Sequence, residues 1–330
     1  MSSKSKILIV RFSSIGDIVL CSPVIRAIDK QWKGGAEIHF ITKKSFAPIL
    51  ENNPHIAKLW TIEKSISELG PDFYSQNFDL IVDLHRNLRT LGLIFKLRRP
   101  FTRLNKLNFR KWIYVRFGIN LMPDIHIVDR YLDPLKKWGV LDDGKGLDYF
   151  FPENFQSKEA DNLKDKKYVV FALGGAHEGK RMTDHQWINV GLAIHHPIVL
   201  LGGKEDVSSA NIIAKALEKK SVNFCNQLSL HGSATVIKNA ELVLSGDTGM
   251  MHIASAFQKK IISLWGCTVP QFGMYPYRAH EASVMLEPDA HPKRPCSKLG
   301  DKCKYGMESR CITGINNDKI IREVERLLKV

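Results

Sequence analysis

The segment "LSGDTGMMHIASAF", from Leu244 to Phe257, holds the end of a strand, a polar turn and the start of a helix. Apolar residues predict a buried strand at Glu241–Ser245 and a helix at Met250–Phe257. The intervening Asp and Thr either cap this helix or bind a phosphate at its N-terminus. A strand that leads directly into a helix is typical of a parallel α/β sheet.

The same alternation runs along the chain on both sides of a polar segment, Leu141–Lys166, which contains several Gly and Pro residues and predicts a linker. Before the linker we predict strands at Lys6–Phe12, Glu37–Thr42, Ala57–Ile62 and Phe78–Leu84, with helices at Asp17–Trp32, Asn87–Leu97 and Val128–Trp138. After it we predict strands at Tyr168–Leu173, Ile198–Leu201 and Lys260–Trp265, and helices at Asp184–His195, Ser208–Leu217, Ser233–Ala240 and Asp318–Leu328. The pattern predicts two doubly wound α/β domains that face each other across a cleft.

Composition limits the class of protein. A chain of 330 residues, 44% hydrophobic and 25% charged, is typical of a two-domain globular protein. No apolar run approaches the ~20 residues of a membrane span, and the apolar run near the N-terminus is too short for a signal peptide. We therefore expect a cytoplasmic protein. The spacing of Cys296, Cys303 and Cys311 matches no zinc motif, so we expect reduced, structural thiols and no bound metal.

Positive charge is concentrated in one stretch. The chain has a net charge of +14, and Lys96–Arg116 contains eight basic residues, four aromatic residues and no acidic residue. Such a stretch is either a solvated surface, a nucleic-acid site or a contact with an anionic membrane. Composition alone does not separate these three interpretations.

Three loops that follow predicted strands carry candidate chemistry. In "RFSSIGDIVL" (Arg11–Leu20) a tight turn precedes Asp17, which is either a helix cap or a general base. In "ALGGAHEGKRMTDHQW" (Ala172–Trp187) Lys180 lies beside flexible backbone, which suits a diphosphate or plain solvent exposure. In "LLGGKEDVSSA" (Leu200–Ala210) Glu205 is placed either to bind ribose hydroxyls or to cap a helix.

Taken together, these features resemble glycosyltransferase family 9, the bacterial heptosyltransferases of lipopolysaccharide assembly. The resemblance rests on "VRFSSIGDIVLCSPVIRAI", "GKRMTDHQW" and "SGDTGMMHIASAFQKKIISLWG" and covers nearly the whole chain. It implies a GT-B fold, with an acceptor-binding domain at 1–155 and a nucleotide-sugar-binding domain at 156–315. The final helix, within 316–330, is then expected to pack back on the first domain.

The resemblance also implies roles for single residues. Asp17 matches the family's catalytic base, Lys180 the lysine that contacts the donor phosphates, and Glu205 a carboxylate near the donor ribose. The remaining implied residues are Asp247, Thr248, Gly249 and His252 in the donor pocket, and Ser13, Ser14, Gly16 and Arg89 on the acceptor side. Met182 and Thr183 replace the family's usual Trp-Pro, which puts the local shape of the donor loop in question.

The implied reaction is the inverting transfer of heptose from ADP-heptose to an anionic, lipid-linked saccharide of the lipopolysaccharide core, without a metal or other cofactor. The inner face of the cytoplasmic membrane is the expected partner surface, and nucleic acid is not. We expect Arg98, Arg99, Arg110 and Lys111 to bind this membrane and the acceptor. A sugar-nucleotide epimerase of the same architecture, a non-enzymatic nucleic-acid-binding protein and a catalytically silent binding protein stay open as alternatives.

Overall fold

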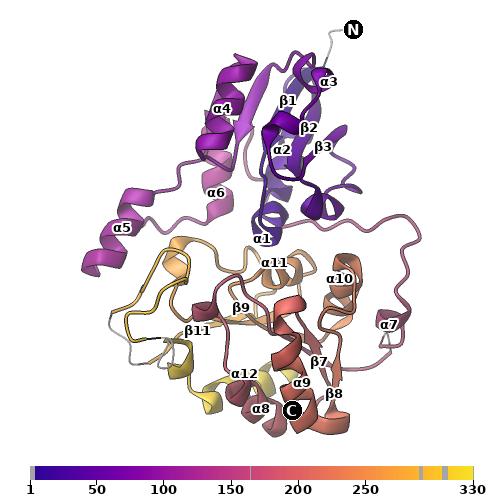
Figure 1. Ribbon diagram of the computed structural model, residues 1–330, viewed down its shortest axis with the longest axis vertical. Helices are drawn as coiled ribbons and strands as arrows, with labels where there is room; N and C mark the ends of the chain where they lie inside the picture. The colour runs from indigo at the N-terminus through magenta and orange to yellow at the C-terminus, as the bar shows by residue number, and fades with distance from the viewer. Residues whose placement is uncertain (1–3, 164, 290–292, 307–310, 330) are drawn as a thin grey trace. The chain divides into compact units, whose positions relative to one another are not determined.

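The computed structural model describes residues 4–163, 165–289, 293–306 and 311–329 and divides the chain into two compact units (Figure 1). The first unit comprises Met1–Lys106 and Ile125–Phe155, and the second comprises Leu107–Asp124 and Gln156–Val330. The chain thus passes between the units after Lys106, after Asp124 and after Phe155.

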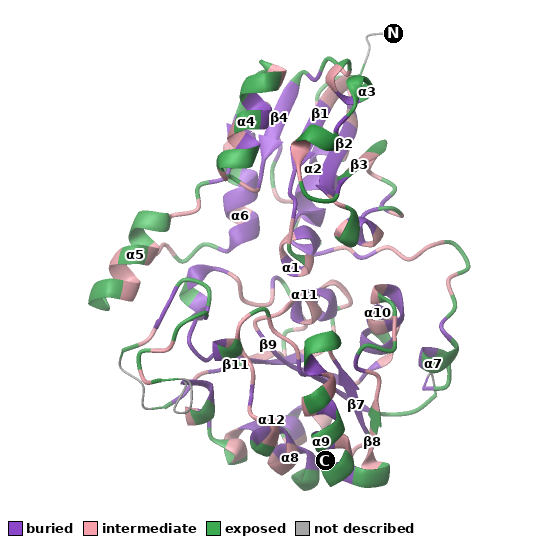
Figure 2. Ribbon diagram, viewed as in Figure 1, coloured by how far each residue is buried: buried purple, intermediate pink, exposed green. Residues whose placement is uncertain are grey.

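The first unit is built on a five-stranded parallel sheet in the order β3-β2-β1-β4-β5. Its strands are β1 (Ser5–Val10), β2 (Ala36–Lys43), β3 (Lys58–Ile62), β4 (Leu80–Asp83) and β5 (Phe101–Arg103). Its helices are α1 (Ile15–Val19), α2 (Ser22–Gln31), α3 (Pro71–Tyr74), α4 (Leu88–Leu97) and α6 (Ile127–Leu132). The central strand β1 is buried from Ile7 to Val10 because helices cover both faces of such a sheet (Figure 2).

The second unit is built on a six-stranded parallel sheet in the order β11-β10-β9-β6-β7-β8. Its strands are β6 (Val169–Ala172), β7 (Ile198–Leu201), β8 (Ser221–Asn223), β9 (Leu242–Gly246), β10 (Lys260–Leu264) and β11 (Val284–Leu286). Its helices are α5 (Asn108–Phe117), α7 (Lys158–Asp161), α8 (Asp184–Ala193), α9 (Val207–Leu217), α10 (Leu230–Asn239), α11 (Gly249–Ala256) and α12 (Asn317–Leu328).

Both sheets reverse their strand order at one point. The reversal lies between β1 and β4 in the first sheet and between β6 and β9 in the second. In open parallel sheets, ligands bind beyond the carboxyl ends of the strands at this switch point. The loops after these four strands are therefore the places to look for a site, and the expectation of two doubly wound units is confirmed.

Two predicted helices are each divided in two. The predicted helix Asp17–Trp32 is α1 followed by α2, with Pro23 in the first turn of α2. The predicted helix Val128–Trp138 is α6 followed by the 3₁₀ helix η3 (Asp133–Trp138), which has Pro134 in its first turn. Proline lacks a backbone N–H, so it is favoured where a helix begins and disfavoured inside one.

The last helix belongs to the second unit, which corrects the expectation that it packs on the first. Its apolar side chains Ile320, Val324 and Leu327 recur at helical spacing and are buried in the core of the second unit, which also contains Trp187 of α8. Helix α12 contacts α8, and Figure 1 shows the two helices side by side. Burial of this single face determines where the helix docks.

Helix α5 lies within the basic stretch and was not predicted from the sequence. None of its residues is buried, and Phe109 and Trp112 on it are exposed (Figure 2). A helix without a buried face leaves no amphipathic pattern to find. Among the described residues, the structure holds no helix with both the length and the apolar character that a membrane crossing demands.

Candidate functional site

An ion pair at the end of β1 fixes the carboxylate of Asp17. Arg11 Nη2 lies 2.6 Å from Asp17 Oδ1. The same guanidinium donates through Nε to the carbonyl oxygen of Ser13 at 2.7 Å and through Nη1 to that of Leu84 at 2.6 Å. Arg11 is only 8% exposed, so these acceptors hold it in one orientation. Arg11 was missed by sequence analysis, although it directly precedes the recognised turn.

Asp17 also helps to begin helix α1. Ser14 is the N-cap residue, and its backbone N–H and Oγ–H donate to Asp17 Oδ2 at 3.2 and 3.0 Å. The helix-capping interpretation of Asp17 therefore has a structural basis. The Asp17 side chain nevertheless remains 22% exposed, so a ligand can reach it and the interpretation as a base stays open.

The electrostatic surroundings keep Asp17 ionised. Burial alone would raise its pKa, but the charge of Arg11 and the hydrogen bonds from Ser14 and Arg11 outweigh burial and hold the pKa below its ordinary value. The Arg11 pKa is raised, since its favourable interactions with Tyr131 and Asp17 outweigh the cost of burial. Asp17 is thus a carboxylate at neutral pH.

Two further groups near Asp17 were not found from the sequence. His85 follows β4, packs against Phe12 with ring centroids 5.1 Å apart, and interacts electrostatically with Arg11 and Asp17. Burial, with the charges of Arg11 and Lys106, lowers the His85 pKa to about 4, so its ring is neutral at physiological pH. Burial, with Arg11, also lowers the pKa of Lys106. The two residues come from distant loops, and no local motif marks them.

A buried carboxylate shapes the loop that carries His85. Asp83, at the end of β4, accepts hydrogen bonds from the backbone N–H groups of His85 at 3.0 Å and Arg86 at 2.7 Å. It also accepts from Thr90 Oγ1 at 2.7 Å and pairs with Arg103 Nε at 2.8 Å. Asp83 is fully buried, and four donors compensate for its desolvation.

Of the other acceptor-side residues predicted from the sequence, three lie in the turn and helix that carry Asp17, and one lies on α4. Ser13 is partly buried, Ser14 is exposed at the N-cap of α1, and Gly16 is buried within α1. Arg89 is exposed on α4.

In the second unit, Lys180 and Asp247 form an ion pair. Lys180 ends the 3₁₀ helix η4 (Glu178–Lys180) after β6, and Asp247 directly follows β9. Lys180 Nζ lies 2.6 Å from Asp247 Oδ2, and the side chains are 15% and 9% exposed. The two loops touch through Gly246, where an added Cβ would lie 2.5 Å from the Lys180 carbonyl oxygen. At position 246, only glycine allows the two loops to come this close.

The remaining predicted donor residues surround the start of α11. Thr248 is the N-cap residue, and its Oγ1 accepts the N–H of Met251 at 3.4 Å and shares a hydrogen bond with Ser245 Oγ at 2.9 Å. Gly249 is the first helical residue, and His252 is buried one turn later. Thr248, and not Asp247, therefore caps the helix, which leaves Asp247 to hold Lys180.

Glu205 is exposed in the 3₁₀ helix η5 (Lys204–Asp206). The buried carboxylate of this loop is the next residue, Asp206, which accepts the backbone N–H of Gly203 at 2.8 Å and lies 3.3 Å from Arg181 Nη1. Asp206 thereby links the loops that follow β6 and β7. Only Glu205, the first of these two adjacent acidic residues, is a candidate from the sequence.

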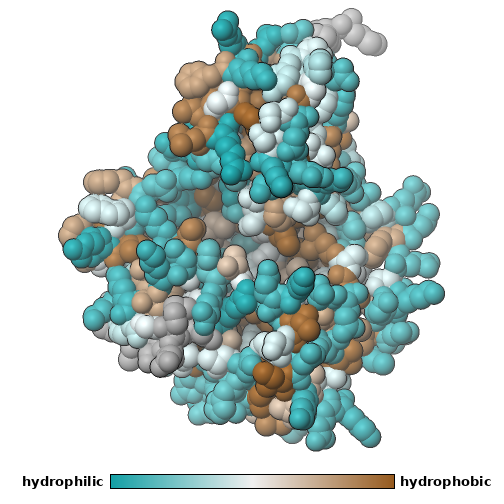
Figure 3. Space-filling view, viewed as in Figure 1, coloured by the Kyte–Doolittle hydropathy of each residue, from teal (hydrophilic) through white to brown (hydrophobic). Residues whose placement is uncertain are grey.

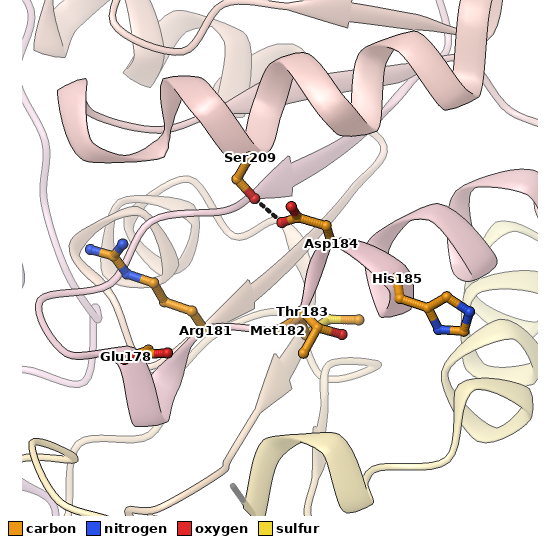
Figure 4. A pocket seen from close by; sticks show the side chains of 7 residues that line it. All are labelled: Glu178, Arg181, Met182, Thr183, Asp184, His185 and Ser209. Carbon is orange, nitrogen blue, oxygen red and sulfur yellow. Dashed lines mark hydrogen bonds between the residues drawn. The ribbon is translucent and has the colours of Figure 1, made fainter. Parts of the chain in front are cut away.

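A surface pocket of about 700 Å³ lies between η4 and the first turn of α8 (Figure 4). Several of the residues that line it flank Lys180 in the sequence. It is lined by Glu178, Arg181, Met182, Thr183, Asp184, His185 and Ser209. None of these is a predicted donor residue. Thr183 caps α8 by accepting the N–H of Gln186 at 3.1 Å, and Met182 is buried in the core. Met182 and Thr183, which replace Trp-Pro, thus have local structural roles. A hydrogen bond from Ser209 to Asp184 connects α9 to α8.

The four basic residues expected to contact a membrane lie directly after α4 and on α5, in two different units. Arg98 caps the C-terminus of α4, and Arg99 donates to Asn77, both in the first unit. Arg110 and Lys111 lie on α5, where Arg110 donates to the Leu121 carbonyl oxygen and Lys111 Nζ lies 5.0 Å from the Phe272 ring centre.

Comparison with known proteins identifies the family. The model of "Glycosyltransferase family 9 (heptosyltransferase)" matches residues 67–303. Lipooligosaccharide heptosyltransferase 2 of Haemophilus influenzae is 32% identical over 308 residues, which cover 81% of this chain and 84% of that protein.

Solved structures have the same fold. A glycosyl transferase family 9 structure from Veillonella parvula aligns with a TM-score of 0.79 at 20% identity and covers 100% of this chain and 99% of that one. The E. coli ADP-heptose lps heptosyltransferase II structure aligns with a TM-score of 0.71 at 16% identity and covers 98% of each chain. The two parallel-sheet units thus form a GT-B fold, and the chain belongs to glycosyltransferase family 9.

Proposed function

We propose that the protein is an inverting glycosyltransferase that moves heptose from ADP-heptose to an anionic, lipid-linked saccharide of the lipopolysaccharide core. The observation that carries this proposal is that polar groups follow all four strands at the two switch points. Arg11 and His85 follow β1 and β4, while Lys180 and Asp247 follow β6 and β9. The names of the H. influenzae and E. coli relatives support heptose as the sugar and, for the E. coli protein, ADP-heptose as the donor.

In this proposal the first unit binds the acceptor and Asp17 is the catalytic base. The acceptor hydroxyl oxygen attacks the anomeric carbon while the bond from that carbon to the diphosphate breaks, and the hydroxyl proton moves to the Asp17 carboxylate. A single displacement inverts the configuration at the anomeric carbon. Asp17 is ionised before the reaction, so its carboxylate can accept this proton.

The second unit binds the donor. Lys180 and the N-terminus of α11 are proposed to stabilise the departing ADP, whose negative charge grows as the glycosidic bond breaks. Asp247, Thr248, Gly249 and His252 are proposed to line this region, and Glu205 is proposed to bind the ribose. Lys180 supplies the charge that a divalent cation supplies in other enzymes, so we expect the same turnover with or without added Mg²⁺ or Mn²⁺.

A panel of nucleotide sugars tests the donor. We expect ADP and ADP-heptose to raise the melting temperature of the protein more than UDP-, GDP- or CMP-sugars. A ligand at ~100 times its Kd stabilises the fold by about 2.7 kcal/mol. Release of ADP should then require an acceptor. Preference for a nucleotide with a nucleobase other than adenine would contradict the donor assignment. Turnover of the sugar without an acceptor would favour an epimerase.

We also propose that the protein is peripheral on the inner face of the cytoplasmic membrane and binds no nucleic acid. Helix α5 supports the membrane contact, because Phe109, Trp112 and Phe117 on it are 71%, 46% and 59% exposed. Arg110 and Arg116 lie beside them, and Figure 3 shows hydrophobic and hydrophilic residues together over this helix. Aromatic rings insert at a lipid interface, and each nearby cation adds about 1 kcal/mol at an anionic surface.

Vesicle binding tests this surface. The double variant Phe109→Ser/Trp112→Ser should bind vesicles containing phosphatidylglycerol several-fold more weakly than the unmodified protein and should show a higher KM for the lipid acceptor. The matched control is Ile212→Ser on α9, which removes a side chain that is 51% exposed elsewhere in the same unit. Equal losses in both proteins, or a loss of RNA binding in the double variant alone, would contradict the proposal.

A further inference from the structure

Four cysteines that are scattered in the sequence meet in the second unit. The Sγ atoms of Cys267, Cys296, Cys303 and Cys311 all lie within 4.8 Å of one another, and three of the four residues are buried. From the sequence, Cys296, Cys303 and Cys311 are predicted to be reduced, structural thiols. Cys267 follows β10, so the fold and not a local spacing motif completes the set.

The spacing of the sulfur atoms suits a single metal ion. A tetrahedral ion with metal–sulfur bonds of about 2.3 Å requires sulfur–sulfur separations of about 3.8 Å. The limit of 4.8 Å for all six separations, with 3.4 Å between Cys296 and Cys311, is close to this geometry. A disulfide needs about 2.05 Å and joins only two sulfurs, so it does not account for a set of four.

Hydrogen bonds hold the loops that carry the four sulfur atoms. The backbone N–H of Cys296 donates to the Cys267 carbonyl oxygen at 2.9 Å, and that of Lys304 donates to Cys296. Arg294 donates to the carbonyl oxygens of Gly266 and Thr268, on either side of Cys267, at 2.6 and 2.8 Å. These contacts fix the backbone on both sides of Cys267, while the Arg294 guanidinium pairs with Glu287 at 2.9 Å.

We propose that Cys267, Cys296, Cys303 and Cys311 bind one zinc or iron ion in a closed, four-thiolate structural site. Tetrahedral sulfur ligation selects these two metals. On binding, each thiol gives its proton to solvent and its sulfur forms one bond to the ion, so a divalent ion is bound without a change of oxidation state. All four positions are then filled by protein, so no position remains for substrate.

The cysteine cluster is in direct contact with the loop that carries Lys180. Cys267 N–H donates to the Gly179 carbonyl oxygen at 3.1 Å. A Cβ added to Gly179 would lie 2.7 Å from Cys267 Sγ and 2.6 Å from the Gly300 carbonyl oxygen, so the two loops are in close contact. We infer that the metal positions Lys180 by holding the loops behind it, an inference that rests on the proposed donor role of Lys180.

Metal analysis of the intact protein tests the site. After purification in the presence of a reductant, elemental analysis should find about one zinc or iron ion per chain. Visible absorption from iron–thiolate bonds would identify iron, whereas zinc is colourless. Cobalt(II) added to the metal-free protein should give the absorption of a tetrahedral thiolate complex. Failure to bind zinc, iron or cobalt, or the recovery of these cysteines as disulfides under reducing conditions, would overturn the proposal.

Single substitutions locate the ligands. Cys303→Ser and Cys311→Ser should each reduce the bound metal at least tenfold and lower the melting temperature. The matched control Cys225→Ser removes a buried thiol of the same unit outside the cluster and should keep the full metal content. If Cys303→Ser folds poorly, the cobalt titration of the unmodified protein still decides the question. Full metal content in both ligand variants would be incompatible with a four-thiolate site.

Binding of ADP separates this inference from the proposed function. We expect Cys303→Ser to weaken ADP several-fold, while Lys180→Ala weakens ADP but keeps the metal. If the unmodified protein holds the metal but does not bind ADP, the donor assignment fails and the metal site stands. If the metal is lost without any change in ADP affinity, the positioning of Lys180 by the metal is wrong.

Discussion

Each unit carries a cation–carboxylate pair beyond the carboxyl ends of its sheet, and both pairs have a closest separation of 2.6 Å. In the first unit, Arg11 and Asp17 lie within one strand-to-helix turn, and the arginine is held by two carbonyl oxygens. In the second unit, Lys180 and Asp247 come from two different loops, and the lysine is a flexible point charge.

This difference indicates which partner of each pair is free to act. Arg11 is buried and has its acceptors within the protein, so Asp17, which is more exposed, is the member available to a substrate. In the second pair Lys180 is the more exposed member and Asp247 the more buried. The same kind of contact thus presents an anion in one unit and a cation in the other, as a base and a diphosphate site require.

The largest effect should follow from loss of the Asp17 carboxylate, the proposed catalytic base. Asp17→Asn keeps the shape of the side chain, but its amide cannot take a proton. We expect kcat to fall by ~10²-fold or more and the Kd for ADP to stay unchanged, because ADP is proposed to bind the other unit. Near-normal turnover of a folded Asp17→Asn protein would reduce Asp17 to a helix cap.

Loss of Arg11 should change both stability and pH dependence. The pKa of Asp17 is lower in the folded protein than in the unfolded chain, so this carboxylate stabilises the fold at neutral pH and loses that effect as the pH falls through the folded pKa. Without Arg11, burial raises the pKa. Arg11→Met should therefore move the acid limb of the kcat/KM profile up by about one pH unit or more. It should also destabilise the fold by about 3 kcal/mol.

Arg11→Lys is the control for this variant, since it keeps the positive charge and should move the acid limb less. The pH profile separates a positioning role from a structural one, because a loss of stability alone would not shift the limb. If the limb is the same in all three proteins, Asp17 is not the group that titrates in it.

The smallest effect is expected in the second pair. Lys180→Ala should weaken ADP and reduce kcat/KM by about tenfold each, equivalent to ~1.4 kcal/mol, because one of several phosphate contacts is lost. Asp247→Asn keeps the lysine and removes only its partner, so ADP affinity should change less. Titration calorimetry measures both. An Asp247→Asn protein that binds ADP more weakly than Lys180→Ala would show that the roles of the two residues are reversed.

The sequence predicted the strands and helices that form both cores, because their apolar periodicity is strong over several turns or pleats. It did not predict the three-residue strands β5, β8 and β11, which are too short for any period to be visible. The family resemblance, and not the residues, placed α12 on the first unit, since an amphipathic face indicates that a helix is buried but does not identify the partner. Only the three-dimensional packing of Ile320 and Val324 answers that question.

At the candidate site, the sequence identified residues within recognisable turns, such as Asp17 and Thr248. It missed His85, Lys106 and the contribution of Cys267 to the cysteine cluster. Each of these comes from a loop that is distant in sequence and becomes a neighbour only when the sheet is formed. Arg11 is different, because it lies beside the recognised turn and reveals its role only through the backbone oxygens that it contacts.

Helix α5 gives the chain an unusual order of assembly during synthesis. The ribosome makes Leu107–Asp124 before nearly all of the second unit, yet Tyr114 packs on Phe272 with ring centroids 6.1 Å apart. At about 5–20 residues per second, α5 waits on the order of ten seconds for this partner. Until then, Phe109 and Trp112 are carried by a nascent chain with a strongly basic segment. Until Phe272 is made, the segment also lacks the aromatic contact that Tyr114 makes within the second unit.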